Sequence, residues 1–462
     1  MDTLQNILLL TDSYKVSHHK QYPPGTETIF SYFESRGGDF SETVFFGLQY
    51  YLKRYLQGVR VTREAIQFAA NFYARHLGNP NIFHRVGWEQ ILSKHGGRLP
   101  VVIRAVPEGT VVPVSNVLMT IENTDPDCYW LTNYLETLLV QVWYASTVAT
   151  QSREMKRTIL KSLQATGDPK LIDFKLHDFG FRGVSSVETA AVGGAAHLVN
   201  FKGTDTVPGL LMASEYYGEP MAGFSIPAAE HSTLTSWGRD HEVDALRNML
   251  HQFPDGLVAV VSDSYDIFNA CSELWGRQLK ADVLARNGTL VVRPDSGDPP
   301  TIVVKVLNLL GERFGTTQNA KGFRVLDPHV RVIQGDGIDR HMLTRILEAM
   351  QREGWSADNV AFGSGGGLLQ KLNRDTSKYA FKCSTARVHG ADRDVYKQPI
   401  TDGGKRSKAG RLKLVRRNGA FATVVDDGNH ADDALVEVFR DGAIVQETTF
   451  ADVRQRAALP EI

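Results

Sequence analysis

Seven short apolar segments between residues 170 and 367 constrain the fold more than any other feature of this chain, because each ends in a polar, glycine-rich or acidic cluster. A helical pattern follows most of these clusters, which are HDFG (177–180), KGTD (202–205), AAEHS (228–232), SDSYD (262–266), RPDSGD (293–298), QGDG (334–337) and GSGGG (363–367). A strand, a polar tip and a helix, repeated about every 25–40 residues, are typical of parallel β/α units. Seven units favour a barrel over an open sheet, and a barrel predicts that all seven clusters meet at the rim that carries the active site.

The sequence on either side of this region predicts a different architecture. Residues 42–56 have apolar side chains at helical spacing, and residues 127–152 predict a long, partly buried helix. Residues 99–122 are rich in valine and isoleucine but are broken by turns, so they predict a small antiparallel unit. Valine-rich strands return after residue 380, with a tight hairpin turn at Asp441–Gly442.

We therefore expect an α/β protein with a (β/α) barrel-like core at residues 166–380. Residues 1–165 and 381–462 lie outside the rhythmic region and share the valine-rich strand pattern. We expect these two parts to pack together as a second, β-rich α+β domain.

The composition excludes several classes of protein. Of the 462 residues 42% are hydrophobic and 22% are charged, as in an ordinary globular protein. The formal net charge of −1 gives no global attraction to nucleic acid or to an anionic membrane, so neither partner is expected. No apolar run is long enough for a transmembrane helix, and the first residues lack the pattern of a secretory signal. The three cysteines lie far apart without a CxxC pair, which favours a reducing, cytoplasmic location.

The glycine-rich cluster GSGGG at residues 363–367 is a candidate phosphate-binding loop. It follows a predicted strand and precedes a helical stretch, so its backbone N–H groups can approach an anion. It matches neither a Walker loop nor a GxGxxG fingerprint. A plain tight turn is the alternative interpretation.

Four acids, Asp205, Asp263, Asp295 and Asp336, fall at predicted strand ends, where carboxylates can bind Mg²⁺ or sugar hydroxyls. Capping of the following helices is the alternative for each of them. Arg293 lies two residues before Asp295 on one strand, so both side chains face the same side.

Two further rim residues are candidates for phosphate chemistry. Arg182 follows HDFGF, and an arginine can hold a phosphate with two hydrogen bonds. His231 lies at a strand tip beside Glu230 and is a catalytic candidate, although a lone histidine is more often structural. The basic run at 405–417 has no interleaved aromatic residues, which favours a small anionic ligand over nucleic acid.

Longer stretches of the chain resemble the barrel-type pyridine phosphoribosyltransferases, in particular the members that use nicotinamide. These stretches span nearly the whole chain in order: TDSYKVSHHKQYPP, YFESRG, FFGLQYYL, ENTDPDCYWLTNYLET, KLHDFGFRGVSS, NFKGTDTV, PAAEHST, VVSDSYDI, RPDSG, VIQGDG, FGSGGGLLQKL and GGKRSKAGRL. The resemblance implies a reaction of nicotinamide with phosphoribosyl pyrophosphate that gives nicotinamide mononucleotide and pyrophosphate, in the salvage of NAD. It also implies Mg²⁺, a homodimer with shared active sites, and ATP hydrolysis through a phosphohistidine.

The resemblance also assigns roles to single residues. His231 is the phosphorylated histidine, Phe179 and Tyr14 of the partner subunit enclose the pyridine ring, and Asp205 faces the carboxamide, with Arg293 close to it and to a phosphate. The other assignments are the ribose and metal region (Asp263, Asp295), the ribose (Gly335, Asp336), phosphate groups (Arg182, Gly365, Gly366) and phosphate groups near the dimer interface (Arg374, Lys382, Lys405). The resemblance leaves open which acids ligate Mg²⁺. Ala380 replaces a phosphate-contacting serine of the family, which puts one hydrogen bond in doubt.

Three alternatives remain at this stage. The nearest is a transferase of the same fold that uses nicotinate, whose ring carries a carboxylate. A barrel aldolase or isomerase requires a Schiff-base lysine or an acid/base pair at a strand end, and Lys202 is the lysine at such a position. A non-catalytic binding role does not account for the number of polar residues expected at the rim.

Overall fold

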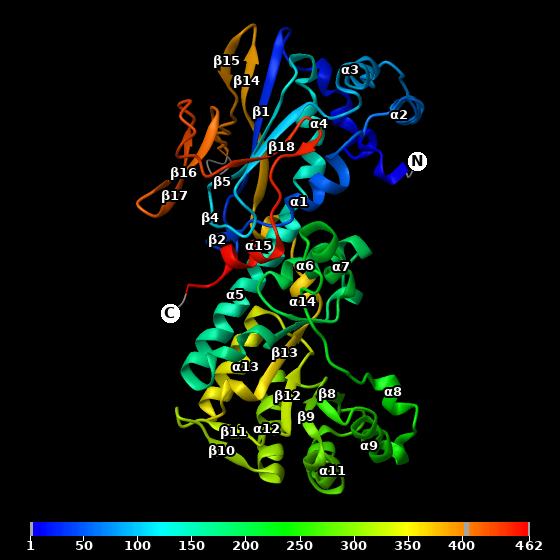
Figure 1. Cartoon of the computed structure of the whole chain (residues 1–462), viewed down its shortest axis with the longest axis vertical. Helices are drawn as coiled ribbons and strands as arrows, with labels where there is room; N and C mark the ends of the chain where they lie inside the picture. The colour runs from blue at the N-terminus through cyan, green and yellow to red at the C-terminus, as the bar shows by residue number, and fades with distance from the viewer. Residues whose placement is uncertain (1–2, 402–405, 461–462) are drawn as a thin grey trace. The chain divides into compact units, whose positions relative to one another are not determined.

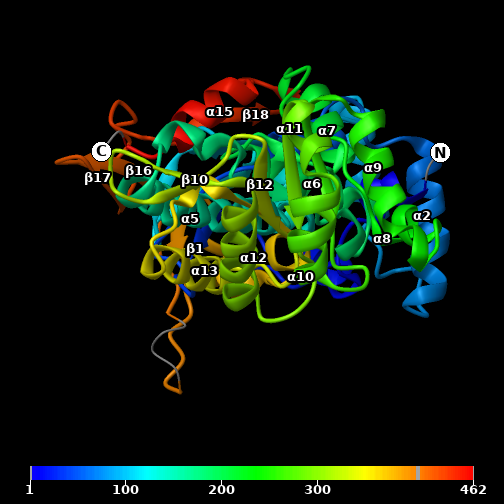
Figure 2. The ribbon, with the colours of Figure 1, turned by 90° about the horizontal axis from the view of Figure 1, so that it is seen from below.

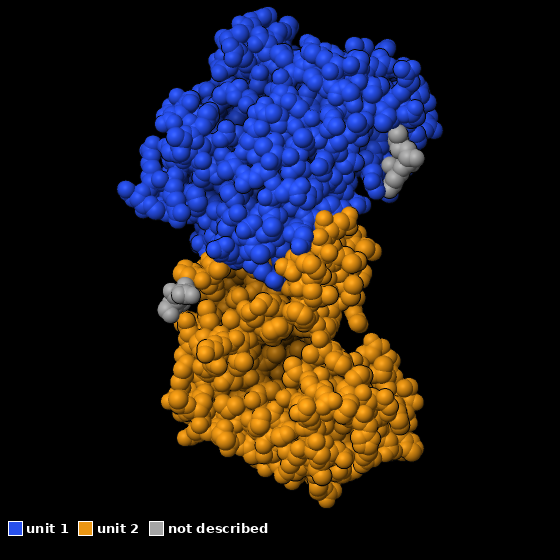
Figure 3. Space-filling model, in the orientation of Figure 1, with its two compact units in different colours: residues 1–150, 216–218, 372–457 blue, residues 151–215, 219–371, 458–462 orange. Residues whose placement is uncertain are grey.

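The computed structural model describes residues 3–401 and 406–460, and the chain divides into two compact units (Figure 3). The first unit comprises residues 1–150, 216–218 and 372–457, and the second comprises residues 151–215, 219–371 and 458–462. The N-terminal third and residues 372–457 therefore belong to the same unit, and the rhythmic region forms most of the second.

The second unit is built on a curled parallel sheet. Its strands are β6 (Leu176–Asp178), β7 (Gly203–Thr204), β8 (Asp255–Val261), β9 (Asn287–Arg293), β12 (Val330–Gln334) and β13 (Val360–Ser364). They lie in the order β7-β6-β13-β12-β9-β8, and every neighbouring pair is parallel. The parallel β/α architecture expected from the sequence is confirmed.

A seventh segment joins the two edges of this sheet. Phe224 forms an isolated parallel bridge with Gly203 of β7, and Ala228 forms one with Ala259 of β8. The bridges are single residue pairs because this stretch (AGFSIPAAE) has no β-branched run, and Pro227 cannot donate a ladder hydrogen bond. Six of the seven expected strands are regular, and the seventh, which ends in AAEHS, is irregular.

Helices cover the outer face of the parallel sheet. The helices of this region are α5 (Val142–Thr166), α6 (Val187–Leu198), α7 (Val207–Tyr217), α9 (Glu242–Gln252), α10 (Ile267–Asn269), α11 (Lys280–Ala285), α12 (Pro299–Phe314) and α13 (Arg340–Arg352), where α5 and α7 each run across a boundary between the units. Two short helices, α8 (His231–Thr235) and α14 (Gly366–Leu369), begin at the carboxyl ends of the strand segments instead. Helices α12 and α13 lie side by side next to β12 (Figures 1 and 2). A small hairpin, β10 (Thr316–Gln318) with β11 (Arg324–Leu326), follows α12.

The alternation of side chains along the strands creates two layers of core. Val258, Val260 and Val292 point to the helices and are fully buried, as expected for parallel strands covered by helices. On the inner face, Ala259, Val291 and Ile333 form a separate cluster with Phe179 packed against it. The inner cluster forms an apolar floor for the space enclosed by the strand ends.

The first unit contains a seven-stranded antiparallel sheet in the order β15-β14-β1-β5-β3-β18-β19. Its strands are β1 (Thr26–Ser35), β3 (Val101–Ala105), β5 (Val117–Asn123), β14 (Tyr379–Val388), β15 (Ala391–Asp394), β18 (Val436–Arg440) and β19 (Ala443–Ile444). Two smaller pairs are β2 (Glu42–Val44) with β4 (Val111–Pro113) and β16 (Leu412–Arg417) with β17 (Ala420–Val425). Its helices are α1 (Leu48–Tyr51), α2 (Arg63–His76), α3 (Arg85–His95), α4 (Leu131–Leu139) and α15 (Phe450–Ala457).

This sheet confirms a second, β-rich domain that combines strands from both ends of the sequence. The hairpin expected at Asp441–Gly442 joins β18 and β19, and both of its residues have positive φ. Two helix predictions are wrong in detail. Residues 42–44 form a strand, because β2 pairs with β4 and α1 begins only after Gly47, whose N–H donates to the Glu108 carboxylate. The helix expected at 127–152 is two helices that are separated at residues 140–141.

In the described part of the chain, none of the helices combines the length and the apolar character needed to cross a bilayer. All three cysteines lie in that part, and none forms a disulfide.

Candidate active site

A cavity of about 960 Å³ opens at the carboxyl ends of the parallel strands, and all of its lining residues belong to the second unit. Ten of the residues singled out from the sequence line it: Phe179, Arg182, Asp205, His231, Arg293, Asp295, Gly335, Asp336, Gly365 and Gly366. They come from loops after six different segments of the sheet, as parallel strands require. Six of the seven polar clusters expected at one rim therefore line this cavity, and the exception is SDSYD (262–266).

One side of the cavity is formed by residues of three adjacent strand segments: His177 within β6, Asp205 directly after β7, and Ser225 within the irregular seventh segment. Nε2 of His177 lies 3.0 Å from Oδ1 of Asp205, and the Ser225 hydroxyl donates to the same oxygen. Burial by itself raises the pKa of Asp205, but these hydrogen bonds and the charges of His177 and Arg293 outweigh it and lower the pKa below its usual value. Asp205 is therefore an ionised carboxylate at neutral pH, and the hydrogen bonds of its side chain go to His177 and Ser225 instead of to backbone N–H groups of the following helix.

A second carboxylate supports His231. Oδ1 of Asp263 lies 3.0 Å from Nε2 of His231, and Oδ2 accepts hydrogen bonds from the backbone N–H of Asp295 and the hydroxyl of Ser296. The side chain of Asp263 is 5% exposed, whereas that of His231 is 46% exposed. Asp263 thus lies behind the histidine and does not itself line the cavity.

Arg293, Asp295 and Phe179 form a third group. The Arg293 guanidinium donates to Oδ1 of Asp295 from Nε at 3.1 Å and from Nη2 at 2.6 Å, as their spacing on one strand predicts. The same guanidinium lies 5.4 Å from the centre of the Phe179 ring. The centre of the His177 ring lies 5.2 Å from the centre of the Phe179 ring. The face of the Phe179 ring and the Arg293 guanidinium, which Asp295 holds in place, therefore lie next to each other in the cavity.

Glycine is required beneath this aromatic ring. A Cβ at Gly363 would lie 1.9 Å from Cε2 of Phe179, and one at Gly335 would lie 3.1 Å from the same atom. Gly366, in contrast, has open space where a Cβ would be. The glycine-rich cluster therefore has two roles, because it seats the Phe179 ring and leaves bare backbone along the cavity wall.

Three of the predicted residues lie elsewhere, and a fourth is not described. Tyr14, Arg374 and Lys382 belong to the first unit, and Lys405 lies outside the described residues. Tyr14 is 62% exposed, and burial lowers the pKa of Lys382. The roles expected for these residues stay predictions.

His177 and Ser225 are the residues that the sequence analysis missed. HDFG was identified as a strand end, and alternation along a strand places His177 on the same side as Phe179. That alternation was a signal for His177. Ser225 gave no comparable signal, because its strand segment is irregular.

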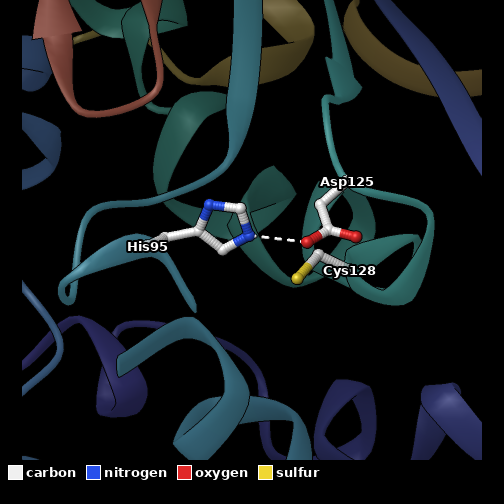
Figure 4. A group of neighbouring side chains, drawn as sticks. All are labelled: His95, Asp125 and Cys128. Atoms are coloured by element: carbon white, nitrogen blue, oxygen red, sulfur yellow. Dashed lines mark hydrogen bonds and ion pairs between the residues drawn. The ribbon is translucent and has the colours of Figure 1, made fainter. Parts of the chain in front are cut away.

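A possible metal-binding group lies outside the cavity, in the first unit (Figure 4). Within the described residues, His95, Asp125 and Cys128 place one potential ligand atom each within 4.8 Å of one another. Hydrogen bonds and an ion pair explain the position of the Asp125 carboxylate without a metal. Its Oδ1 accepts from the backbone N–H of Asp127, and its Oδ2 lies 2.6 Å from Nε2 of His95 and 2.7 Å from Nζ of Lys94. Burial raises the pKa of the Cys128 thiol to about 12, so the sulfur is protonated. We interpret this group as a structural link between the end of α3 and the turn that follows β5.

Comparison with known proteins finds matches along nearly the whole chain. Residues 174–443 match the model of the nicotinate phosphoribosyltransferase (NAPRTase) family, and residues 6–103 match that of the nicotinamide phosphoribosyltransferase N-terminal domain. The nicotinamide phosphoribosyltransferase of Xanthomonas campestris pv. campestris is 54% identical over 99% of both chains. That of Acinetobacter baylyi is 33% identical over 98% of this chain and 97% of its own. Among solved structures, a nicotinate-nucleotide pyrophosphorylase from Pyrococcus furiosus shares the fold, with a TM-score of 0.62 at 16% identity over 99% of this chain and 95% of that one.

Proposed function

The chain belongs to the nicotinate phosphoribosyltransferase family, and nicotinamide phosphoribosyltransferases match it along nearly its whole length. It is therefore a pentosyltransferase of NAD biosynthesis, and we propose how its cavity performs the reaction. Nicotinamide phosphoribosyltransferases transfer the phosphoribosyl group of phosphoribosyl pyrophosphate to nicotinamide. Nicotinamide mononucleotide and pyrophosphate are the products. The observation that carries our proposal is the placement of an ionised Asp205 beside an aromatic face and an arginine pair in one cavity.

The reaction breaks the bond between C1 of the ribose and pyrophosphate and forms one between C1 and the pyridine nitrogen. That nitrogen already carries a lone pair, so no general base is required. Charge separates as the pyrophosphate departs, and the ribose gains oxocarbenium character, as in other glycosyl transfers. We assign the stabilisation of this positive charge to the nearby carboxylates of Asp295 and Asp336, and that of the departing pyrophosphate to Arg182 and Arg293.

The ring is held against Phe179, and its carboxamide meets Asp205. A carboxylate can accept a hydrogen bond from the carboxamide NH₂, whereas it repels the carboxylate of nicotinate. A site built for one hydrogen-bonding group can reject an analogue that lacks it by roughly 10⁴-fold. Selection of the amide over the acid is therefore assigned to Asp205, and this disfavours the alternative of nicotinate as substrate.

We assign binding of the ribose phosphate to the backbone at Gly365 and Gly366. Binding of the ribose hydroxyls is assigned to Gly335 and Asp336. Bare backbone can approach an anion closely, because no side chain at these positions stands in the way.

We propose that ATP hydrolysis is coupled to turnover through phosphorylation of His231. Asp263 is an acceptor when ionised, so the proton of the neutral imidazole lies on Nε2 and Nδ1 keeps the lone pair. Transfer of the γ-phosphoryl group of ATP to His231 would place negative charge in the cavity that holds Arg182 and Arg293. Hydrolysis of that phosphohistidine would then be coupled to turnover.

The acids of the cavity suit Mg²⁺ that is bound together with the phosphate groups of the substrate. Mg²⁺ is commonly held by one or two carboxylates together with substrate phosphates, and Asp295 and Asp336 both face the cavity. When bound, the ion would supply neutralising charge for the leaving pyrophosphate.

We also propose a homodimer with shared active sites. Tyr14 is exposed and belongs to the first unit, whereas the residues that line the cavity belong to the second. Tyr14 of the partner subunit would cover the second face of the pyridine ring. Arg374, Lys382 and Lys405 would bind phosphate groups near the dimer interface. The free cysteines are consistent with a cytoplasmic enzyme.

Pyrophosphate release tests the proposed function. The purified protein is supplied with phosphoribosyl pyrophosphate, Mg²⁺ and either nicotinamide or nicotinate, with and without ATP. We expect efficient release with nicotinamide, faster in the presence of ATP. Equal efficiency with nicotinate would contradict the assignment of Asp205.

A further inference from the structure

The hydrogen bonds around Asp205 are one-sided. His177 and Ser225 both donate to Oδ1, and no hydrogen bond from the described residues reaches Oδ2. The Asp205 side chain is 45% exposed and faces the cavity, whereas that of His177 is 13% exposed. Two donors from neighbouring strand segments thus hold one oxygen and leave the other to a ligand.

The fold holds His177 itself in place. His177 pairs with Gly203 in the parallel register of β6 and β7, and a Cβ at Gly203 would lie 2.8 Å from Nδ1 of the imidazole. Gly203 therefore provides room for the ring beside Asp205. Since an ionised carboxylate only accepts hydrogen bonds, Nε2 must carry the proton.

We propose that His177 is a positioning and specificity-determining residue: with Ser225, it holds Asp205 so that only Oδ2 is presented to the carboxamide NH₂ of nicotinamide. This inference rests on the proposed role of Asp205. It adds that selectivity depends on a residue that does not contact the amide. An unheld carboxylate can rotate, or can turn both oxygens toward solvent, and would then present no fixed acceptor.

Steady-state kinetics of the full-length enzyme test this, with both pyridines and with His177→Phe, His177→Gln and Asp205→Asn. His177→Phe keeps a ring but loses the donor, and hydrogen bonds to charged groups of this kind correspond to about 10- to 100-fold in selectivity. We expect kcat/KM for nicotinamide to fall by that factor relative to nicotinate, while KM for phosphoribosyl pyrophosphate stays unchanged. His177→Gln can restore a donor near the position of Nε2 and should recover most of the selectivity.

Non-additivity separates positioning from a general structural effect. If His177 acts through Asp205, the double variant of His177→Phe and Asp205→Asn should be no less selective than Asp205→Asn alone. Gly203→Ala should displace the imidazole and give a weaker form of the same loss, although it leaves both partners chemically intact. His329→Phe is the matched control, since His329 pairs with Asp327 at 2.7 Å at the amino end of β12, away from the cavity.

The pH profile gives a further readout. Among the described residues, the charged groups that act on Asp205 electrostatically are His177 and the buried Asp178 of β6 and Arg293 of β9. Loss of the His177 donor should move the acidic limb of kcat/KM for nicotinamide to higher pH.

The outcomes distinguish this inference from the proposed function. If Asp205→Asn lowers selectivity but folded His177→Phe does not, the positioning role is wrong and the proposed function stands. If Asp205→Asn has no effect on selectivity, the role of Asp205 is wrong and the inference fails with it. Equal losses for His177→Phe and His177→Gln, with equal losses in the Asp205→Asn background, would show a purely structural role and overturn the inference.

Discussion

Nε2 of His231 lies 3.0 Å from Oδ1 of Asp263, and the other oxygen of this almost fully buried carboxylate is held by the backbone of Asp295 and the hydroxyl of Ser296. The acid is therefore fixed from one side and orients the histidine on the other. In the proposed mechanism this relationship determines which imidazole nitrogen meets the phosphoryl group.

His231→Ala should abolish ATP hydrolysis and strongly lower ATP-coupled turnover, because no other nitrogen occupies this position. Asp263→Asn should lower ATP hydrolysis by roughly 10- to 100-fold, since it removes the charged acceptor that fixes the imidazole. Phosphate release from ATP measures both effects, and circular dichroism checks the fold. Full ATPase activity in His231→Ala would contradict the phosphohistidine.

Mixing two inactive variants tests the shared active site. Tyr14→Ala and His231→Ala each damage every site of a homodimer, but a mixed dimer keeps one site with both residues intact. Half of the dimers are mixed after complete subunit exchange, so about a quarter of wild-type activity should return. Exchanged mixtures that stay inactive would contradict a shared site, as would an active monomer.

Gly363→Ala and Gly366→Ala should affect different substrates. A methyl group at residue 363 collides with the Phe179 ring, so KM for nicotinamide should rise by up to about 100-fold, the order of effect of a misplaced substrate-binding group. A methyl group at residue 366 meets no protein atom but faces the proposed phosphate site, so KM for phosphoribosyl pyrophosphate should rise instead. Kinetics with each substrate varied in turn measure both. The same KM pattern in the two variants would contradict the separate roles.

Acid should destabilise the enzyme partly through His197. Burial lowers the pKa of this histidine to about 3, and its ring lies between the Ser152 hydroxyl and the carbonyl of Gly203. The unfolded chain takes up a proton near pH 6.5, so the stability contributed by the neutral ring is fully present above that pH and is lost as the pH falls toward 3.

Between pH 7.5 and 5.5, the free energy of unfolding of the wild type should therefore fall by about 1.4 kcal/mol more than that of His197→Gln. Urea denaturation at both pH values measures this difference. His251→Gln, on the exposed side of α9, is the control and should behave as wild type. An unchanged pH dependence in His197→Gln would show that His197 makes no such contribution.

The sequence predicts the parallel core and its rim well, because each strand ends in a polar cluster that alternation and turn chemistry make visible. Arg293 with Asp295 is the clearest case, since their spacing alone places them together. The residues at 42–44 were predicted as helix because apolar periodicity does not reveal that β4 supplies a pairing partner for them.

Contacts between segments distant in the sequence are what the pattern does not contain. Ser225 reaches Asp205 only because an irregular segment joins β7 to β8. Asp263 was expected to line the ribose and metal region, but it lies behind His231, and no local signal distinguishes a supporting acid from a lining one.

A competition assay tests the central claim, that Asp205 selects the amide, most directly. Wild type and Asp205→Asn are each incubated with phosphoribosyl pyrophosphate and equal concentrations of nicotinamide and nicotinate, and the two mononucleotide products are separated and quantified. We predict almost only nicotinamide mononucleotide from the wild type, and a product ratio shifted strongly toward nicotinate mononucleotide in Asp205→Asn. Comparable amounts of both products from the wild type, or the same ratio from both proteins, would contradict the account.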